Sequence, residues 1–143
     1  MIFLTKPEQF NPKFEVVSCF FEYDGRLLLL ERQDHKPQGG TWGVPAGKID
    51  PGETPEVAML RELFQETGFV ADRTKIYYLK KLFVRYPAYD FVYYIFDLKL
   101  DNEPIIKINP GEHKSFQWLS PTQALKIDLI EDLDGCISLS YKI

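Results

Sequence analysis

The chain has 143 residues, is 45% hydrophobic and 15% aromatic, and carries a formal net charge of −4 with an isoelectric point near 5.2. A chain of this length can bury one core and is too short for us to expect two, so we predict one domain over residues 1–143. The acidic balance argues against a broad surface for duplex nucleic acid or anionic lipid, because both need clustered positive charge. A small anionic substrate is still compatible with this charge if a metal ion neutralises it.

The cysteines and the hydropathy pattern indicate the compartment. Cys19 lies in an apolar run and Cys136 lies near the end of the sequence, which favours two reduced thiols that fill a core over a disulfide framework. No basic and apolar N-terminal signal is visible, and no apolar run approaches the roughly 18 residues that a membrane span needs. We therefore expect a soluble, cytoplasmic protein with no membrane partner.

The first elements in chain order form a predicted β-hairpin. Two β-rich or apolar segments, residues 14–23 and 26–32, are separated by Asp24-Gly25, which is the dipeptide of a tight two-residue turn. Residues 1–13 contain two prolines and little periodicity, so we expect an irregular arm before the hairpin.

The stretch from 33 to 41 contains one proline and two glycines and should form a loop. Arg32, His35 and Lys36 at its edge could contact a substrate phosphate. They could equally be ordinary solvated residues, since charged loop residues are common. His35 has no visible partner that would make it a catalytic base.

A helix is predicted over residues 55–67. Thr54 can cap its N-terminus, Pro55 suits the first helical turn, and Gly68 suits the left-handed residue just past its end. The spacing therefore marks both ends of the helix.

The faces of this helix carry different chemistry. Val57, Leu60 and Phe64 recur at helical spacing and are predicted to form a buried stripe, while Glu62 and Glu66 project together from another face. Like charges one turn apart repel, and carboxylates in the last turn oppose the helix dipole, each at a cost of up to about 1 kcal/mol. A counter-charge from outside the helix is therefore expected, and a hard divalent cation that prefers oxygen ligands is the natural candidate.

Two strand-like segments, residues 75–85 and 90–100, follow the helix and hold most of the aromatic residues. Some of these rings could stack on a nucleobase, but aromatics at strand spacing more often belong to a core. Residues 91–96 are apolar on both sides, which indicates deep burial.

The C-terminal part is predicted to alternate between loop, strand and helix. Residues 101–115 should form a loop, with room for a short strand at 105–108, and residues 116–119 a last strand. Ser120-Pro121 should start a helix by the same cap-then-proline pattern, and the tail from 128 to 143 is amphipathic enough to be helical. Strands interspersed with helices suggest an α/β fold in which a mixed sheet has helices on both faces.

Residues 47–69 resemble the signature of the Nudix hydrolases, the MutT-like family, GX5EX7REUXEEXGU, in which U is a bulky apolar residue. The fixed positions that match in register are Gly47, Glu53, Arg61, Glu62, Leu63, Glu66, Gly68 and Phe69. Gln65 departs from the pattern, because it stands where the first glutamate of the Glu-Glu pair is expected. The surroundings are also similar to the family, with Trp42-Gly43-Val44-Pro45 before the box and Glu112 six residues before Trp118.

The resemblance implies the Nudix α/β/α sandwich, with its mixed β-sheet between helices, and a metal-dependent pyrophosphohydrolase. A pyrophosphate repels a nucleophile through its negative oxygens, and Mg²⁺ answers this by neutralising charge and acidifying a bound water. By position in the box, Glu62 and Glu66 are implied as ligands of Mg²⁺, or of Mn²⁺, with the Gly47 carbonyl as a further ligand. Glu53 and Arg61 look like an ion pair that orients the site by fixing the loop against the helix.

Gln65 and Glu112 affect the expected number of metal ions and the choice of general base. Glutamine removes a full negative charge, so one ion could bind more weakly or be lost, and more of the work would fall to a base elsewhere. Glu112 stands where many family members place an acidic residue that ligates metal or deprotonates the attacking water; otherwise it is an ordinary loop acid. Neighbouring His113 is a second candidate for that role.

The expected substrate is a nucleoside diphosphate linked to another group, with nucleoside triphosphates first and nucleotide sugars second. Tyr86 resembles the residue typical of diadenosine-polyphosphate hydrolases, and Pro87 resembles the residue typical of ADP-ribose hydrolases. These two residues therefore imply different substrates. Two alternatives stay open: hydrolysis at the sugar carbon, as in the GDP-mannose hydrolase branch, and a non-catalytic Nudix module that senses a nucleotide. A homodimer is possible, because dimers are common among relatives.

Overall fold

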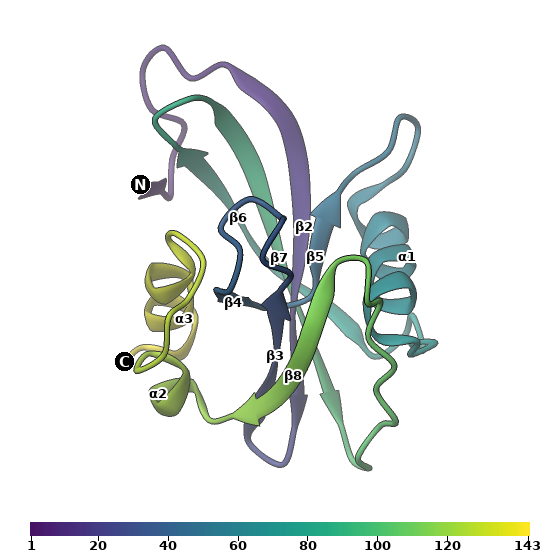
Figure 1. Ribbon diagram of the computed structural model, residues 1–143. Helices are drawn as coiled ribbons and strands as arrows, with labels where there is room; N and C mark the ends of the chain where they lie inside the picture. Colours follow the sequence, from purple (N-terminus) through teal and green to yellow (C-terminus); the bar gives the residue numbers. More distant parts are fainter.

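A mixed β-sheet with helices on both faces makes up the fold, and the computed structural model describes residues 1 to 143 (Figure 1). The elements, in chain order, are β1 (Ile2–Phe3), β2 (Pro12–Tyr23), β3 (Arg26–Arg32), β4 (Trp42–Gly43), β5 (Ala46–Lys48), α1 (Pro55–Thr67), β6 (Ile76–Arg85), β7 (Asp90–Leu100), β8 (His113–Leu119), α2 (Pro121–Ala124) and α3 (Leu133–Tyr141). The strand order is β1-β6-β7-β2-β3-β4, with β5 paired to β2 and β8 paired to β3. β2 and β7 are parallel, whereas the other strand pairs are antiparallel. The predicted mixed sheet is therefore confirmed.

Elements with strong local signals form where the sequence predicts them. Asp24 and Gly25 have positive φ angles of 52° and 71°, which the tight turn between two twisted antiparallel strands requires. α1 and β7 span the predicted residues 55–67 and 90–100. α2 begins after the predicted cap, Ser120, whose side chain accepts a backbone hydrogen bond from the first turn.

Two predicted boundaries are wrong because strand pairing extends the sheet. Residues 1–13 are not irregular throughout: Ile2–Phe3 pairs with β6, and β2 already begins at Pro12. β8 begins at His113 and not at residue 116, because His113 pairs with Arg32 at the end of β3.

Two further predictions near the C-terminus need correction. Residues 105–108 form no strand, because the Lys107 backbone N–H donates to the Thr67 carbonyl oxygen at 2.8 Å and ties this segment to the end of α1. The tail is helical only from Leu133, since Asp132 adopts a left-handed conformation with φ of 68° directly before α3. The helix therefore starts later than residue 128.

The sheet separates two apolar clusters, and helices cover both. The cluster on the α1 face comprises Val17, Cys19, Phe21, Leu28, Leu30, Ala58, Met59, Leu63, Ile76, Phe96 and Leu98. The cluster facing α2 and α3 comprises Phe20, Leu27, Leu29, Val44, Leu82, Val84, Phe91, Tyr93, Ile95, Ala124, Leu133, Cys136 and Ile137. Both cysteines are buried and unpaired, as predicted. This arrangement confirms the α/β/α sandwich (Figure 1), and none of its helices is long and apolar enough to cross a membrane.

The face that α1 buries differs from the predicted one. Val57 and Phe64 are 44% and 56% exposed, so the predicted apolar stripe points largely to solvent. The side chains that α1 buries instead are Ala58, Met59, Leu63, Glu66 and Thr67. Because Glu66 lies on this inward face, α1 turns its acidic residues toward the sheet and leaves part of its apolar surface outside.

Candidate metal and catalytic site

The ends of α1 are fixed by local hydrogen bonds. The Thr54 hydroxyl accepts from the Val57 N–H at 3.2 Å, and Gly68, with φ of 72°, donates its N–H to the Phe64 carbonyl at 2.9 Å. A helix capped at both ends holds its side chains in a fixed orientation. This orientation directs Glu62 and Glu66 toward β5, beside which α1 lies (Figure 1).

Arg61 joins α1 to the loop that precedes it. Its Nε and Nη2 atoms donate to the two carboxylate oxygens of Glu53 at 2.8 and 2.9 Å, and Nη2 also donates to the Lys48 carbonyl at 3.0 Å. Nη1 donates to Glu62 at 2.7 Å and to Gln65 at 3.1 Å. The hydrogen bonds from Arg61 lower the pKa of Glu53 to about 2. The expected Glu53–Arg61 ion pair is therefore present, and the same guanidinium also holds Glu62.

Glu62 lies against the backbone of Gly47. A Cβ atom at residue 47 would overlap the Glu62 carboxyl group, so glycine leaves room for this carboxylate beside β5. Burial raises the pKa of Glu62, while the hydrogen bond from Arg61 opposes that effect. Two of the residues predicted from the box thus meet directly.

Glu66 is the most enclosed of the predicted carboxylates, with 5% of its surface exposed. One of its oxygens accepts from the Ala46 backbone N–H at 2.7 Å, and the other lies 3.8 Å from Nδ1 of His113. Burial raises the pKa of Glu66 well above its ordinary value, and the negative charges of Glu62 and Glu112 raise it further. An ionised Glu66 therefore needs a positive charge close by.

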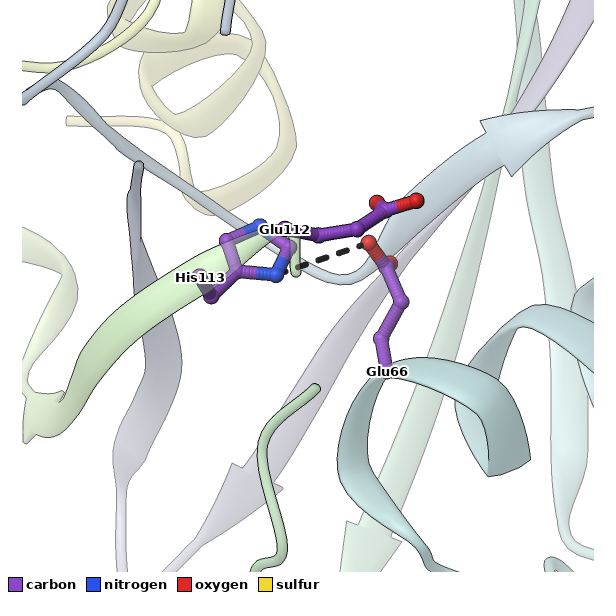
Figure 2. Close-up of side chains that lie close together, drawn as sticks. All are labelled: Glu66, Glu112 and His113. Atoms are coloured by element: carbon purple, nitrogen blue, oxygen red, sulfur yellow. Dashed lines mark ion pairs between the residues drawn. The ribbon is translucent and has the colours of Figure 1, made fainter. Parts of the chain in front are cut away.

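Glu112 approaches Glu66 from the opposite side of the site, at the start of β8 (Figure 2). The backbone N–H groups of Glu112 and His113 both donate to the Asn109 carbonyl, at 3.0 and 2.9 Å, and the Glu112 carbonyl accepts from the Gln33 N–H at 2.9 Å. Ligand atoms of Glu66, Glu112 and His113 all lie within 4.8 Å of one another. Carboxylate oxygens at this separation suit a hard divalent cation.

Gln65 does not join this group. Its side chain is exposed on α1 and accepts from Arg61. The one position that departs from the Nudix signature thus lies in the network around Arg61, beside Glu62.

Two of the three loop residues considered for phosphate binding lie near the cluster. The positive charges of Arg32 and Lys36 contribute to lowering the pKa of His113, after the larger effect of burial. Arg32 also donates from Nε to the Pro37 carbonyl at 2.7 Å, which fixes the side chain within its own loop. His35 is exposed and makes no hydrogen bond or ion pair with the acidic residues.

Aromatic side chains extend from this region over the α3 face of the sheet. Lys48, next to Gly47, places its ammonium 4.3 Å from the centre of the Phe14 ring, and Phe14 stacks on Phe91 with ring centres 5.6 Å apart. Phe91 in turn packs edge-on against Tyr86 at 5.0 Å. Phe91 and Tyr86 both line a small, mostly apolar pocket at the start of α3.

Comparison with known proteins decides the family. The family model described as "NUDIX domain" matches residues 12–138. The chain belongs to the Nudix family. It is accordingly a hydrolase that acts on phosphorus-containing anhydrides, as the resemblance in residues 47–69 implies.

Individual relatives agree with this assignment. The "CTP pyrophosphohydrolase" of Escherichia coli is 30% identical over 117 residues, which covers 80% of this chain and 82% of that protein. The solution structure of the Escherichia coli ORF135 protein has a TM-score of 0.75 at 25% identity and covers 90% of this chain and 89% of its own. The NUDIX domain of Shewanella oneidensis NrtR, solved in complex with ADP ribose, has a TM-score of 0.77 at 22% identity over 96% of this chain and 92% of its own, and this likeness concerns the fold alone.

Some contacts in and around the candidate site have no clear sequence signal. The Ala46 N–H that binds Glu66 is a backbone group, and no side-chain pattern could reveal it. Phe14 and Lys48 lie on β2 and β5, far apart in sequence, and only the pairing of these two strands brings them together. That pairing, with Val16 opposite Lys48, cannot be deduced from local patterns.

Proposed function

We propose that the protein binds Mg²⁺, or Mn²⁺ in its place, through Glu62, Glu66, Glu112 and the Gly47 carbonyl. With the metal it hydrolyses a pyrophosphate bond in a nucleoside diphosphate linked to another group. The observation that carries this proposal is the approach of Glu66 and Glu112, whose ligand atoms lie within 4.8 Å of one another and of His113. Glu62, one turn before Glu66 on α1, lies close enough for its charge to raise the pKa of Glu66. Nudix hydrolases generally use a divalent metal ion, which agrees with this donor set.

The electrostatics of the three carboxylates support a bound cation. Each of Glu62 and Glu66 has its pKa raised by burial, and the charge of Glu112 adds to both effects. Of these three carboxylates, only Glu62 forms an ion pair with an arginine or lysine, namely Arg61. A divalent cation between the carboxylates would favour their ionised forms and remove the repulsion.

The residues divide the chemistry between them. A metal ion bound here would neutralise phosphate charge and acidify a bound water. Glu112 is exposed, unlike Glu66, so it can exchange protons with solvent and is our choice for the general base or a metal ligand. Arg61 and Glu53 orient Glu62, and we assign them to positioning and not to direct chemistry.

Nucleoside triphosphates are the first substrate class that we propose, and nucleotide sugars the second. The similarity to a CTP pyrophosphohydrolase over most of both chains supports this order. A homodimer remains a prediction.

The test is a product-release assay over nucleoside triphosphates, nucleotide sugars, ADP-ribose and dinucleoside polyphosphates, with Mg²⁺ and with chelator. We expect metal-dependent turnover of one class. Glu66→Gln should lower turnover by about two to four orders of magnitude, because it removes a charged ligand, whereas Glu103→Gln, an exposed residue in the 101–104 loop, should leave turnover unchanged. Full activity of Glu66→Gln would contradict the metal-site assignment.

Product identity separates the alternatives. Cleavage of the pyrophosphate yields two phosphorylated fragments, whereas attack at the sugar carbon releases free sugar and an intact nucleoside diphosphate. Tight nucleotide binding without turnover at any Mg²⁺ or Mn²⁺ concentration would support the sensing module instead.

A further inference from the structure

His113 is a buried side chain that has no role in the proposed reaction. Only 4% of its surface is exposed, and its Nδ1 atom is buried without a hydrogen-bond partner. A buried ring nitrogen without a partner costs free energy comparable to a lost hydrogen bond. The nearest acidic group to this atom is the Glu66 carboxylate, 3.8 Å away (Figure 2).

The backbone of His113 is held on both sides. Its N–H donates to Asn109 at 2.9 Å, its carbonyl accepts from the Gln33 side chain at 3.4 Å, and it pairs with Arg32 in the sheet. A histidine anchored in this way presents its ring to Glu66 in a preset orientation.

One oxygen of the Glu66 carboxylate accepts a hydrogen bond, and the other does not. The Ala46 N–H holds one oxygen at 2.7 Å, while the oxygen that faces His113 has no hydrogen bond. A separation of 3.8 Å is too long for a hydrogen bond, and closing it takes a shift of only about 1 Å. Carboxylates that ligate metals are commonly hydrogen-bonded by a neighbouring group, which fixes their orientation.

We infer that His113 is a positioning residue for the metal site: its imidazole donates from Nδ1 to Glu66 and fixes the carboxylate for metal binding. Glu66 would then be held by a donor on each oxygen, from β5 and from β8, and its remaining lone pairs would face the ion. Mg²⁺ prefers oxygen ligands, which argues against direct ligation by the ring. This inference rests on the proposed function.

Two substitutions separate the ring nitrogens. His113→Asn places an amide N–H where Nδ1 lies, whereas His113→Gln places it near the position of Nε2. We expect His113→Asn to bind Mn²⁺ within about threefold of the wild type, and His113→Gln to lose about 10- to 100-fold in Mn²⁺ affinity. Affinity is measured by calorimetry and by electron paramagnetic resonance of free Mn²⁺, and circular dichroism melts verify that both variants fold.

The outcomes keep the two proposals apart. Wild-type Mn²⁺ binding with equal affinities for the Asn and Gln variants would overturn the role of His113 while leaving the proposed function intact. Pulsed resonance that shows nitrogen bound directly to Mn²⁺ would also overturn it, since His113 would then be a ligand. Absence of Mn²⁺ binding in the wild type would instead contradict the metal site itself, and this inference with it.

Discussion

Replacing Gly47 by alanine tests whether the site depends on where the Glu62 carboxylate lies. An added Cβ would overlap the carboxyl carbon and both oxygens of Glu62. Because these atoms end a flexible side chain, the carboxylate can move aside, and we expect the free energy of unfolding to change by about 1 kcal/mol or less. The hydrogen bond from Arg61, at 2.7 Å, holds Glu62 in its present place beside β5, and this movement would stretch or break it.

The expected loss is mainly one of catalysis. Relieving the overlap moves the carboxylate by about 1 Å or more, and a misplacement of that size can lower the rate by about 100-fold. This loss corresponds to about 2.7 kcal/mol in activation free energy. Gly47→Ala should therefore separate activity from stability, with Mn²⁺ affinity falling together with turnover.

The assay compares turnover with Mg²⁺, calorimetric Mn²⁺ affinity and urea unfolding in three proteins: the wild type, Gly47→Ala and Gly43→Ala. Gly43 lies on neighbouring β4, where an added Cβ would meet Ile130 at 3.4 Å, an ordinary contact. We expect this control to retain turnover and metal affinity. Wild-type turnover and metal affinity in Gly47→Ala would refute the reasoning, because they would show that the approach of Glu62 to residue 47 is unimportant.

Three further predictions concern the surroundings of the site. Glu53→Gln should lower turnover by about tenfold with the fold intact, because it weakens the hold on Arg61; unchanged steady-state rates would rule out the orienting role. Gln65→Glu should leave turnover unchanged or strengthen metal binding, and a collapse of activity would reveal a separate role for the amide. Burial, and next the neighbouring Asp97, raise the pKa of Glu22 to about 8. Between about pH 4.5 and pH 8 the folded protein therefore keeps a proton that the unfolded chain has released. The free energy of unfolding should accordingly fall as the pH rises through this range. Each pKa unit corresponds to about 1.4 kcal/mol. Because solvent screens part of this effect, we expect a loss on the order of 2 kcal/mol by urea unfolding. A persistent slope in Glu22→Gln would exclude Glu22 as its source.

Local sequence predicts an element where the determining contacts lie within a few residues of one another. The turn at Asp24-Gly25 needs only two residues with positive φ, and α1 needs only Thr54 at one end and Gly68 at the other. The ion pair of Glu53 and Arg61 is expected only from their positions in the Nudix signature, and not from a local pattern of the sequence.

Local sequence does not determine which face of α1 is buried. Val57 and Phe64 have the spacing of a core stripe, yet they are exposed, because α1 instead presents Met59 and Leu63 to the sheet together with Glu66. Predicting the buried face of a helix from the spacing of its apolar residues assumes that every carboxylate faces solvent. This assumption fails where carboxylates line a site. The buried position of Glu66 also depends on the Ala46 N–H, which no side-chain pattern records.

For Gln65, which departs from the Nudix signature, the sequence and the structure suggest different effects on metal binding. From the sequence, its missing charge suggests a weaker or absent metal ion. In the structure, Gln65 and Glu62 share one nitrogen of Arg61, at 3.1 and 2.7 Å, and the neutral amide is the weaker competitor for that guanidinium. A glutamate at residue 65 would compete more strongly for Arg61 and would add a negative charge beside Glu62, so the natural glutamine leaves Arg61 to hold Glu62 in place. We therefore expect this departure to act on metal affinity through charge and through the network around Arg61, since Gln65 makes no hydrogen bond with the proposed ligands Glu66 and Glu112.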